Sequence, residues 1–262
     1  DLRRVSELLG RLGVKTDGLP IVHIAGTKGK GSTAAMVASI LTAAQYRTGL
    51  FTSPHLHSLC ERFIVDGEPI AENDFTQLVS SAKPKIAKMN REHTWGKLTT
   101  FEALTCLALL YFQETKVEVL VLETGLGGRL DATNVVNSDV SVITSISYDH
   151  TEILGASLEM IASEKAGIIK KGRPVVTSPQ HPIVTRVLNQ FCKKQGSPLL
   201  QIGNQILVER EIISVDGQTF NVKGPNYHHR VTTSLIGSHQ IENGAAAIGA
   251  VELLRQQGLN IS

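Results

Sequence analysis

The sequence predicts an α/β fold in which a mostly parallel central sheet is covered by helices on both faces, with a small antiparallel meander near residues 199–235. Three observations lead to this prediction. Short β-branched runs alternate with amphipathic segments along most of the chain. A glycine-rich loop joins the first of these runs to a helix. Beyond Leu199 the pattern changes to closely spaced strands separated by turns.

The expected elements follow one another in an alternating order. Strands are predicted at residues 21–25, 48–52, 117–122, 140–144 and 174–177. Helices are predicted near residues 32–44, 74–90, 100–114, 157–167 and 182–195, with a last helix around 239–257. Turn signals in the meander lie at Asp216-Gly217 and Gly224-Pro225. This alternation is typical of a three-layer domain.

The composition of the chain favours some classes of protein function over others. The 262 residues, 42% hydrophobic and 19% charged, suit one large α/β domain or two small ones. A net charge of +2 favours small anionic partners over nucleic acid or an anionic membrane. No apolar run reaches the ~18 residues that span a bilayer, and no signal-like segment opens the sequence. Cys60, Cys106 and Cys192 lack C-x-x-C spacing, which is typical of reduced thiols, so we expect a cytoplasmic protein.

The segment between the first predicted strand and its helix is rich in glycine and lysine. It consists of Gly26, Thr27, Lys28, Gly29, Lys30, Gly31, Ser32 and Thr33. Glycines let backbone N–H groups face phosphate oxygens, the helix adds the positive end of its dipole, and Lys30 can neutralise the β- and γ-phosphates. We interpret the segment as a P-loop-type cradle for ATP or GTP. The alternative is a purely structural strand-to-helix turn.

The match to the general G-x-x-x-x-G-K-[ST] pattern is incomplete. Ile24 stands where the pattern has its first glycine, and Gly31 stands where it has a hydroxyl. Hydroxyl groups follow at Ser32 and Thr33, and which of them would meet Mg²⁺ stays open.

Polar residues follow several predicted strands. Ser53 comes after the second strand, Glu123 after the third and Asp149-His150 shortly after the fourth. Ligands of doubly wound sheets bind at the carboxyl ends of the strands, so these side chains are expected to form one site. Glu123 is the first candidate for a carboxylate that holds Mg²⁺. The alternatives are that Glu123 caps a helix or pairs with Arg129, and that His150 is structural.

Several motifs, in this order along the chain, resemble those of the folylpolyglutamate synthase/dihydrofolate synthase family within the wider Mur ligase group. They are Gly26–Ser32, Thr52-Ser53-Pro54-His55-Leu56, Glu61-Arg62, the stretch from Leu122 to Asn134, Asp149-His150 and the stretch from Glu164 to Lys170. The resemblance implies that residues 1–262 are a Mur-ligase-like ATP-binding domain. The glutamate-ligase domain of the family would lie beyond Ser262, so we expect weak nucleotide binding and little or no ligase activity from residues 1–262 alone.

The resemblance also implies a reaction. ATP would phosphorylate the carboxylate of a folate or of dihydropteroate, and the amine of L-glutamate would attack the acyl phosphate, in an enzyme that is monomeric at full length. Lys30 would hold the phosphates, and Ser53, Glu123 and His150 would coordinate Mg²⁺. Lys165 would be a catalytic lysine that CO₂ converts to a carbamate. From the residues alone, a solvated charge is the favoured interpretation of Lys165, and only the resemblance reverses that preference.

The remaining expectations concern substrate and nucleotide contacts. Pro54, His55 and Arg62 resemble a family loop that closes over the pterin. Phe101 is expected either to stack on a flat heterocycle or to belong to the core. Asn243 resembles the asparagine of a family H-Q-x-x-N segment near the nucleotide, and Ser238 is expected to cap that helix.

One further departure from the family and two other classes of function stay open. Lys28 stands where many members of the family carry asparagine. One other class is a Mur-type peptidoglycan ligase, which Gly31 and the Thr-Ser-Pro-His-Leu segment disfavour. The other is a non-catalytic nucleotide-binding module whose ATP state controls a partner.

Overall fold

The computed structural model describes residues 2–92 and 95–261. Its centre is an eight-stranded sheet with the order β4-β3-β2-β5-β1-β6-β7-β8. The strands are β1 (Ile21–Ala25), β2 (Thr48–Phe51), β3 (Phe63–Val65), β4 (Glu68–Pro69), β5 (Val119–Glu123), β6 (Val140–Ile143), β7 (Val175–Thr177) and β8 (Leu199–Gln201). All neighbouring pairs from β2 to β8 are parallel, whereas β3 and β4 are antiparallel additions at one edge.

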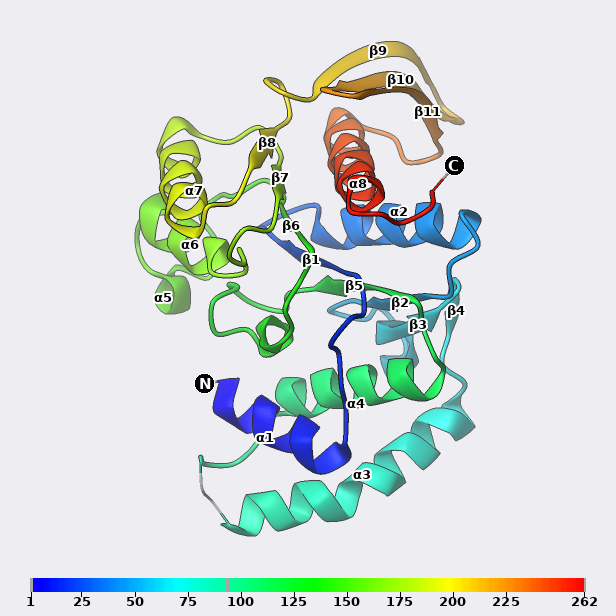
Figure 1. Ribbon diagram of the computed structural model, residues 1–262, viewed down its shortest axis with the longest axis vertical. Helices are drawn as coiled ribbons and strands as arrows, with labels where there is room; N and C mark the ends of the chain where they lie inside the picture. The colour runs from blue at the N-terminus through cyan, green and yellow to red at the C-terminus, as the bar shows by residue number, and fades with distance from the viewer. Residues whose placement is uncertain (1, 93–94, 262) are drawn as a thin grey trace.

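Helices cover both faces of this sheet, as Figure 1 shows. On one face, α2 (Lys30–Ala43) and α8 (Ser238–Gln256) pack together over the central strands. The opposite face is covered by α1 (Leu2–Leu12), α3 (Glu72–Glu92), α4 (Thr100–Glu114), α6 (Leu158–Ala166) and α7 (Pro182–Gln195). Every residue of β1, β5 and β6 is buried, because parallel strands between two helical layers have no solvent-facing side.

A separate three-stranded antiparallel sheet, with the order β11-β10-β9, lies beyond α8 (Figure 1). Its strands are β9 (Leu207–Ser214), β10 (Gly217–Gly224) and β11 (Tyr227–Thr233). Phe220 of β10 is fully buried in the cluster that α2 and α8 share, so this sheet extends the core. The two turns lie at residues 215–216 and 225–226, each within one residue of its predicted position.

The three-layer α/β prediction is confirmed, with local corrections. The expected meander began too early, because residues 199–201 form β8 and pair in parallel with β7. Neither the antiparallel edge of β3 and β4 nor the first helix α1 was expected from the sequence. The strands β3 and β4 are only 3 and 2 residues long, so they carry no clear period. In contrast, α1 is an amphipathic segment of 11 residues whose periodicity was overlooked, and its Arg4 pairs with Glu102 of α4 at 2.7 Å.

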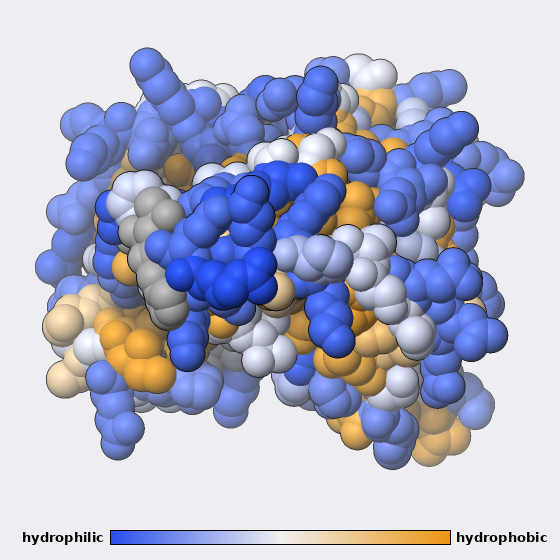
Figure 2. Space-filling model, turned by 90° about the horizontal axis from the view of Figure 1, so that it is seen from below, coloured by the Kyte–Doolittle hydropathy of each residue, from blue (hydrophilic) through white to orange (hydrophobic). Residues whose placement is uncertain are grey.

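Seen from the side of α3, the molecular surface is mostly hydrophilic with scattered apolar residues (Figure 2). Within residues 2–92 and 95–261, no helix has the length and apolarity to cross a membrane. The three cysteines are unpaired and buried.

Candidate active site

The glycine-rich loop lies between β1 and α2 and touches the ends of two other elements. Gly26 has a φ of 152°, and a Cβ there would lie 1.8 Å from Oγ1 of Thr144. Gly29 has a φ of 86°, and a Cβ there would lie 2.3 Å from Oδ1 of Asn243. The amide of Thr27 donates to the carbonyl oxygen of Ser145 at 2.9 Å. Glycine is therefore required at both positions by the backbone angle and by the close neighbours.

Three of the predicted site residues meet at the carboxyl edge of the sheet. Nζ of Lys30 lies 3.8 Å from Oε1 of Glu123, and the amide of Ser53 donates to Oε2 of Glu123 at 3.1 Å. They meet because β5 lies between β2 and β1, so the residues after these three strands share one edge. Burial raises the pKa of Glu123, and the nearby Lys30 opposes that shift. The alternative pairing with Arg129 is wrong, since Arg129 contacts Glu164 at 2.9 Å.

Lys165 reaches the same region from α6. Its side chain is only 4% exposed, and its Nζ donates to the carbonyl oxygen of Gly26 at 2.7 Å. Burial, and to a lesser degree the charge of Lys30, lower the pKa of Lys165 to about 8. The interpretation of Lys165 as a solvated charge is therefore wrong.

His150 and the two hydroxyls after Lys30 have different environments. His150 precedes the short helix α5 (Thr151–Leu154), has a φ of 48°, and its Nε2 lies 3.7 Å from Asp149. The side chain of His150 is exposed, and the residue ends the segment that follows β6. In the sheet, β6 lies beside β1. Thr33 is fully buried, whereas Ser32 is half-buried. Ser32 is the more accessible of the two hydroxyls.

The predicted substrate residues lie on the loop after β2 and at the start of α4. Pro54 is exposed and follows a cis peptide bond, and Nε of Arg62 donates to Nδ1 of His55 at 2.9 Å. The ring of Phe101 lies 6.0 Å from that of Phe51 and packs over Gly125. Phe101 therefore belongs to the margin of the core, and its stacking on a ligand stays a prediction.

Asn243 lies on α8 beside the glycine-rich loop. It is 5% exposed, its Oδ1 faces Gly29, and its Nδ2 donates to Oε1 of Gln240 at 2.9 Å. The expected cap by Ser238 is wrong, because the helix begins at Ser238 and Gly237 occupies the cap position without a side-chain hydrogen bond. The contact of Asn243 with a nucleotide stays a prediction.

Two residues near the site were missed by the sequence reasoning. Asp131 accepts hydrogen bonds from the amides of Leu126 at 2.8 Å and Thr133 at 3.0 Å, and so shapes the loop after β5. Gln180, just after β7, accepts from the amide of Ile146 at 3.0 Å and donates to the carbonyl oxygen of Thr144 at 2.9 Å. Ligands bind at the carboxyl ends of parallel strands, so the position of Gln180 after β7 could have identified it. Asp131 lies within the stretch from Leu122 to Asn134 that carries the resemblance, but no role was predicted for it.

The residues at this edge fit a hard divalent cation. The Glu123 carboxylate is buried, and the contacts described above leave lone pairs free for a metal. Oxygen ligands of this kind suit Mg²⁺, which retains several waters and often takes only one or two protein carboxylates. Within the described part of the chain, no three His, Cys, Asp or Glu side chains converge as a closed metal site.

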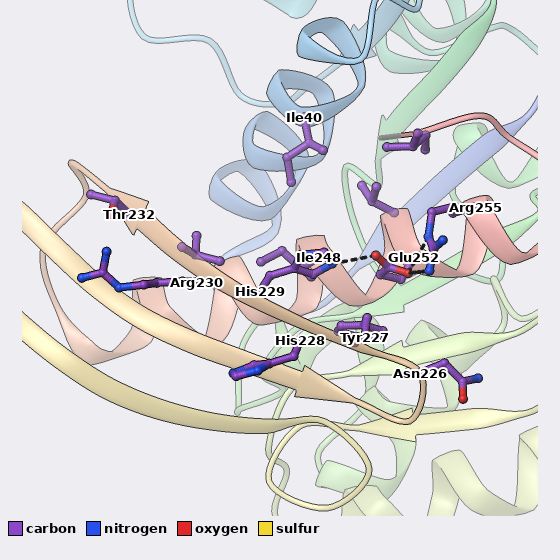
Figure 3. Close-up of a pocket in the computed structure, with 13 residues that line it drawn as sticks. Ile40, Asn226, Tyr227, His228, His229, Arg230, Thr232, Ile248, Glu252 and Arg255 are labelled. Atoms are coloured by element: carbon purple, nitrogen blue, oxygen red, sulfur yellow. Dashed lines mark hydrogen bonds and ion pairs between the residues drawn. The ribbon is translucent and has the colours of Figure 1, made fainter.

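A cavity of about 660 Å³ lies elsewhere, between β11, α8 and Ile40 of α2 (Figure 3). Ile40 is ten residues beyond Lys30, which is about 15 Å along a helix. The buried Glu252 in its wall is bonded by His229 at 2.7 Å and by Arg255 at 2.9 Å. Both carboxylate oxygens are therefore satisfied within the chain, and the lining of this cavity includes neither Lys30 nor Glu123.

The sequence comparisons point to one family. A model described as the Mur ligase middle domain matches residues 24–251. The dihydrofolate synthase/folylpolyglutamate synthase of Bacillus subtilis is 40% identical over 260 residues, which are 98% of this chain and 60% of that relative.

Solved structures agree with the sequence comparisons. A structure described as an FPGS–AMPPCP–folate complex matches with a TM-score of 0.93 at 34% identity, covering 98% of this chain and 63% of that one. Mycobacterium tuberculosis folylpolyglutamate synthase complexed with ADP matches with a TM-score of 0.92 at 37% identity, covering 97% and 58%. The chain thus spans between 58% and 63% of the length of these two proteins.

Proposed function

This chain belongs to the Mur ligase family through its middle domain, and from that premise we propose that the protein carrying it is an ATP-dependent ligase. The proposed reaction joins L-glutamate to the carboxylate of a folate or of dihydropteroate. The observation that carries the proposal is the meeting of Lys30, Glu123 and the Ser53 amide beside a glycine-rich loop. The similarity to folylpolyglutamate synthases supports the choice of acceptor.

The nucleotide would bind along the loop from Gly26 to Thr33. Backbone amides and the N-terminus of α2 would face the phosphates, and Lys30 would neutralise their charge. Ser53, Glu123 and His150 would hold Mg²⁺, which neutralises charge on the transferring phosphoryl group. Asn243, packed against Gly29, would fix the loop and meet the nucleotide.

Lys165 would act as a carbamate. Its neutral amine adds to CO₂ and releases one proton, which leaves an anionic carbamate in place of a cation. A pKa of about 8 supports this step, because a substantial fraction of the amine is neutral at mildly alkaline pH. Forming the carbamate would change the contact between Lys165 and Gly26.

The acceptor would lie against the loop after β2. Pro54, His55, Arg62 and Phe101 are the residues proposed to contact it. Transfer of the γ-phosphoryl group to its carboxylate would give an acyl phosphate, and attack by the amine of L-glutamate would form the amide and release phosphate. Exclusion of water would be essential, because water hydrolyses an acyl phosphate.

The test is ADP formation that depends on the acceptor. Dihydropteroate or a reduced folate, each with L-glutamate, is compared with a UDP-linked muropeptide and its amino acid, using the full-length polypeptide. We expect ADP and a glutamate conjugate only with the pteridine acceptors. Turnover with the muropeptide alone would favour a peptidoglycan ligase, and nucleotide binding without turnover on any acceptor would favour a non-catalytic module.

A further inference from the structure

The loop from Thr52 to Arg62 is built around one carboxylate. Its ends are joined by a hydrogen bond from the amide of Thr52 to the carbonyl oxygen of Arg62 at 3.4 Å. Inside the loop, the two oxygens of Glu61 accept three amide hydrogen bonds, from Leu56 at 2.8 Å, His57 at 2.9 Å and Ser58 at 2.7 Å. The loop therefore closes on itself through its own backbone and one side chain.

Helix capping explains only part of this arrangement. Ser58 and Glu61 form a capping box at the short 3₁₀ helix of residues Leu59–Arg62, which accounts for the bond from the Ser58 amide. The bonds from Leu56 and His57 lie outside that motif. Leu56 is also 84% exposed, so apolar packing of this side chain does not hold the tip of the loop. The Glu61 carboxylate is the group that orders residues 56 and 57.

The hydrogen bonds to Glu61 favour the ionised form of its carboxyl group. The amides of Leu56 and Ser58 lower the pKa of this carboxyl to about 2, because they bond its ionised form. Hydrogen bonds to an ionised acceptor are stronger than those between neutral groups. Replacing the carboxylate with a neutral amide of the same shape is therefore a sensitive test of its role.

Arg62, the residue after Glu61, orients the imidazole ring of His55. Nε of Arg62 donates to Nδ1 of His55 at 2.9 Å. Arginine nitrogens only donate, so Nδ1 must be the accepting nitrogen of the imidazole. The ring proton is consequently on Nε2, and His55 offers one N–H donor on the side of its ring away from Arg62.

We propose that Glu61 is the positioning residue of this loop, and that Glu61 and Arg62 together present the Nε2–H of His55 to a carbonyl or carboxylate oxygen of the acyl acceptor. The identity of the acceptor rests on the proposed function. The order that Glu61 imposes on the loop does not depend on that function.

Amide hydrogen exchange, measured by NMR, tests the first half of the inference. In Glu61→Gln we expect the amides of residues 56–58 to exchange about tenfold faster or more, since weaker bonds open more often. Glu114→Gln, at an exposed glutamate ending α4, is the matched control and should leave these amides unchanged. Unchanged exchange in Glu61→Gln would overturn the proposal. So would a proton found on Nδ1 of His55 in a long-range ¹H–¹⁵N spectrum.

Steady-state kinetics of the full-length polypeptide test the second half. We expect Glu61→Gln to raise KM for the pteridine acceptor several-fold while KM for ATP changes by less than about twofold, and Glu61→Asp to recover part of the loss. Faster exchange without any change in the acceptor KM would overturn the role of the loop in binding. Failure of the proposed function is a separate result, because the unmodified protein would then form no acceptor-dependent ADP.

Discussion

Nζ of Lys165 donates a hydrogen bond of 2.7 Å to the carbonyl oxygen of Gly26, so a residue of α6 fastens the loop between β1 and α2. The two residues are 139 positions apart in the sequence. Gly26 itself is pressed against Thr144, so the start of the loop is held from two sides. This contact links the shape of the glycine-rich loop to the protonation state of a buried amine.

The buried amine of Lys165 should make the stability of the protein depend on pH. The pKa of Lys165 is lowered to about 8 from 10.5, so the unfolded chain binds more protons between these values. The free energy of unfolding should therefore rise with pH in this window, by up to about 1.4 kcal/mol per pH unit, relative to Lys165→Met. Urea unfolding in CO₂-free buffer from pH 7.5 to 10 measures it. The pKa of Lys170 is also lowered by burial, but this residue is present in both proteins, so its contribution cancels. Parallel curves of unfolding free energy against pH for the two proteins would contradict the prediction.

Replacing Glu123 should separate activity from stability. Glu123→Gln removes a buried carboxylate whose pKa is raised by burial, so we expect an unchanged or higher melting temperature. Acceptor-dependent ADP formation should fall about 100-fold or more, because the proposed metal ligand is lost. Glu209→Gln, at an exposed position on β9, is the control for both measurements. Retained turnover in Glu123→Gln would exclude Glu123 as the metal ligand.

Two neighbouring glycines should tolerate alanine differently. A Cβ at Gly29 would lie 2.3 Å from Asn243 at a φ of 86°, whereas a Cβ at Gly31 would lie 3.5 Å from Glu123 on a helix. Gly29→Ala should weaken ATP binding about tenfold or more, through strain in the loop. Gly31→Ala should change it by less than about twofold. Calorimetric titration with a non-hydrolysable ATP analogue compares them, and equal affinities would show that the Asn243 contact does not shape the loop.

His23 should make the protein sensitive to acid. It is completely buried in β1, where burial and then the charge of Lys170 lower its pKa to about 3. The unfolded chain binds this proton near pH 6.5, so stability is lost as pH falls from about 6.5 toward 3, by up to about 1.4 kcal/mol per unit. His23→Gln should lose less stability than the unmodified protein over this range in urea unfolding. His228→Gln, at an exposed histidine of β11, is the control and should behave like the unmodified protein.

The strands of the central sheet were predictable from their local composition, whereas the amphipathic helix α1 was missed although its periodicity is strong. Each of the five strands predicted for the central sheet lies within two residues of its observed bounds, because buried parallel strands are short apolar runs between turns. The edge strands β3 and β4 were not predictable, because they are too short to carry a period. Residues 199–201 were assigned to the wrong sheet, since strand pairing is a long-range choice that local composition does not encode.

The residues of the candidate site were also predictable only in part. Lys30 and Glu123 could be singled out because a glycine-rich loop and a strand end are local patterns. The partners of Glu61 lie within five residues, yet the bonds themselves depend on how the loop folds back.

The sequence by itself determined the α/β class, the position of the glycine-rich loop and the strand ends where polar residues stand. Periodicity, glycine spacing and strand-end chemistry are properties of short segments, so they can be read without coordinates. Only the tertiary structure decided that Lys165 is buried against Gly26, that Arg129 pairs with Glu164 rather than Glu123, and that Asn243 faces Gly29. Burial and pairing depend on which distant segments the sheet order brings together, and that order follows from packing of the whole core.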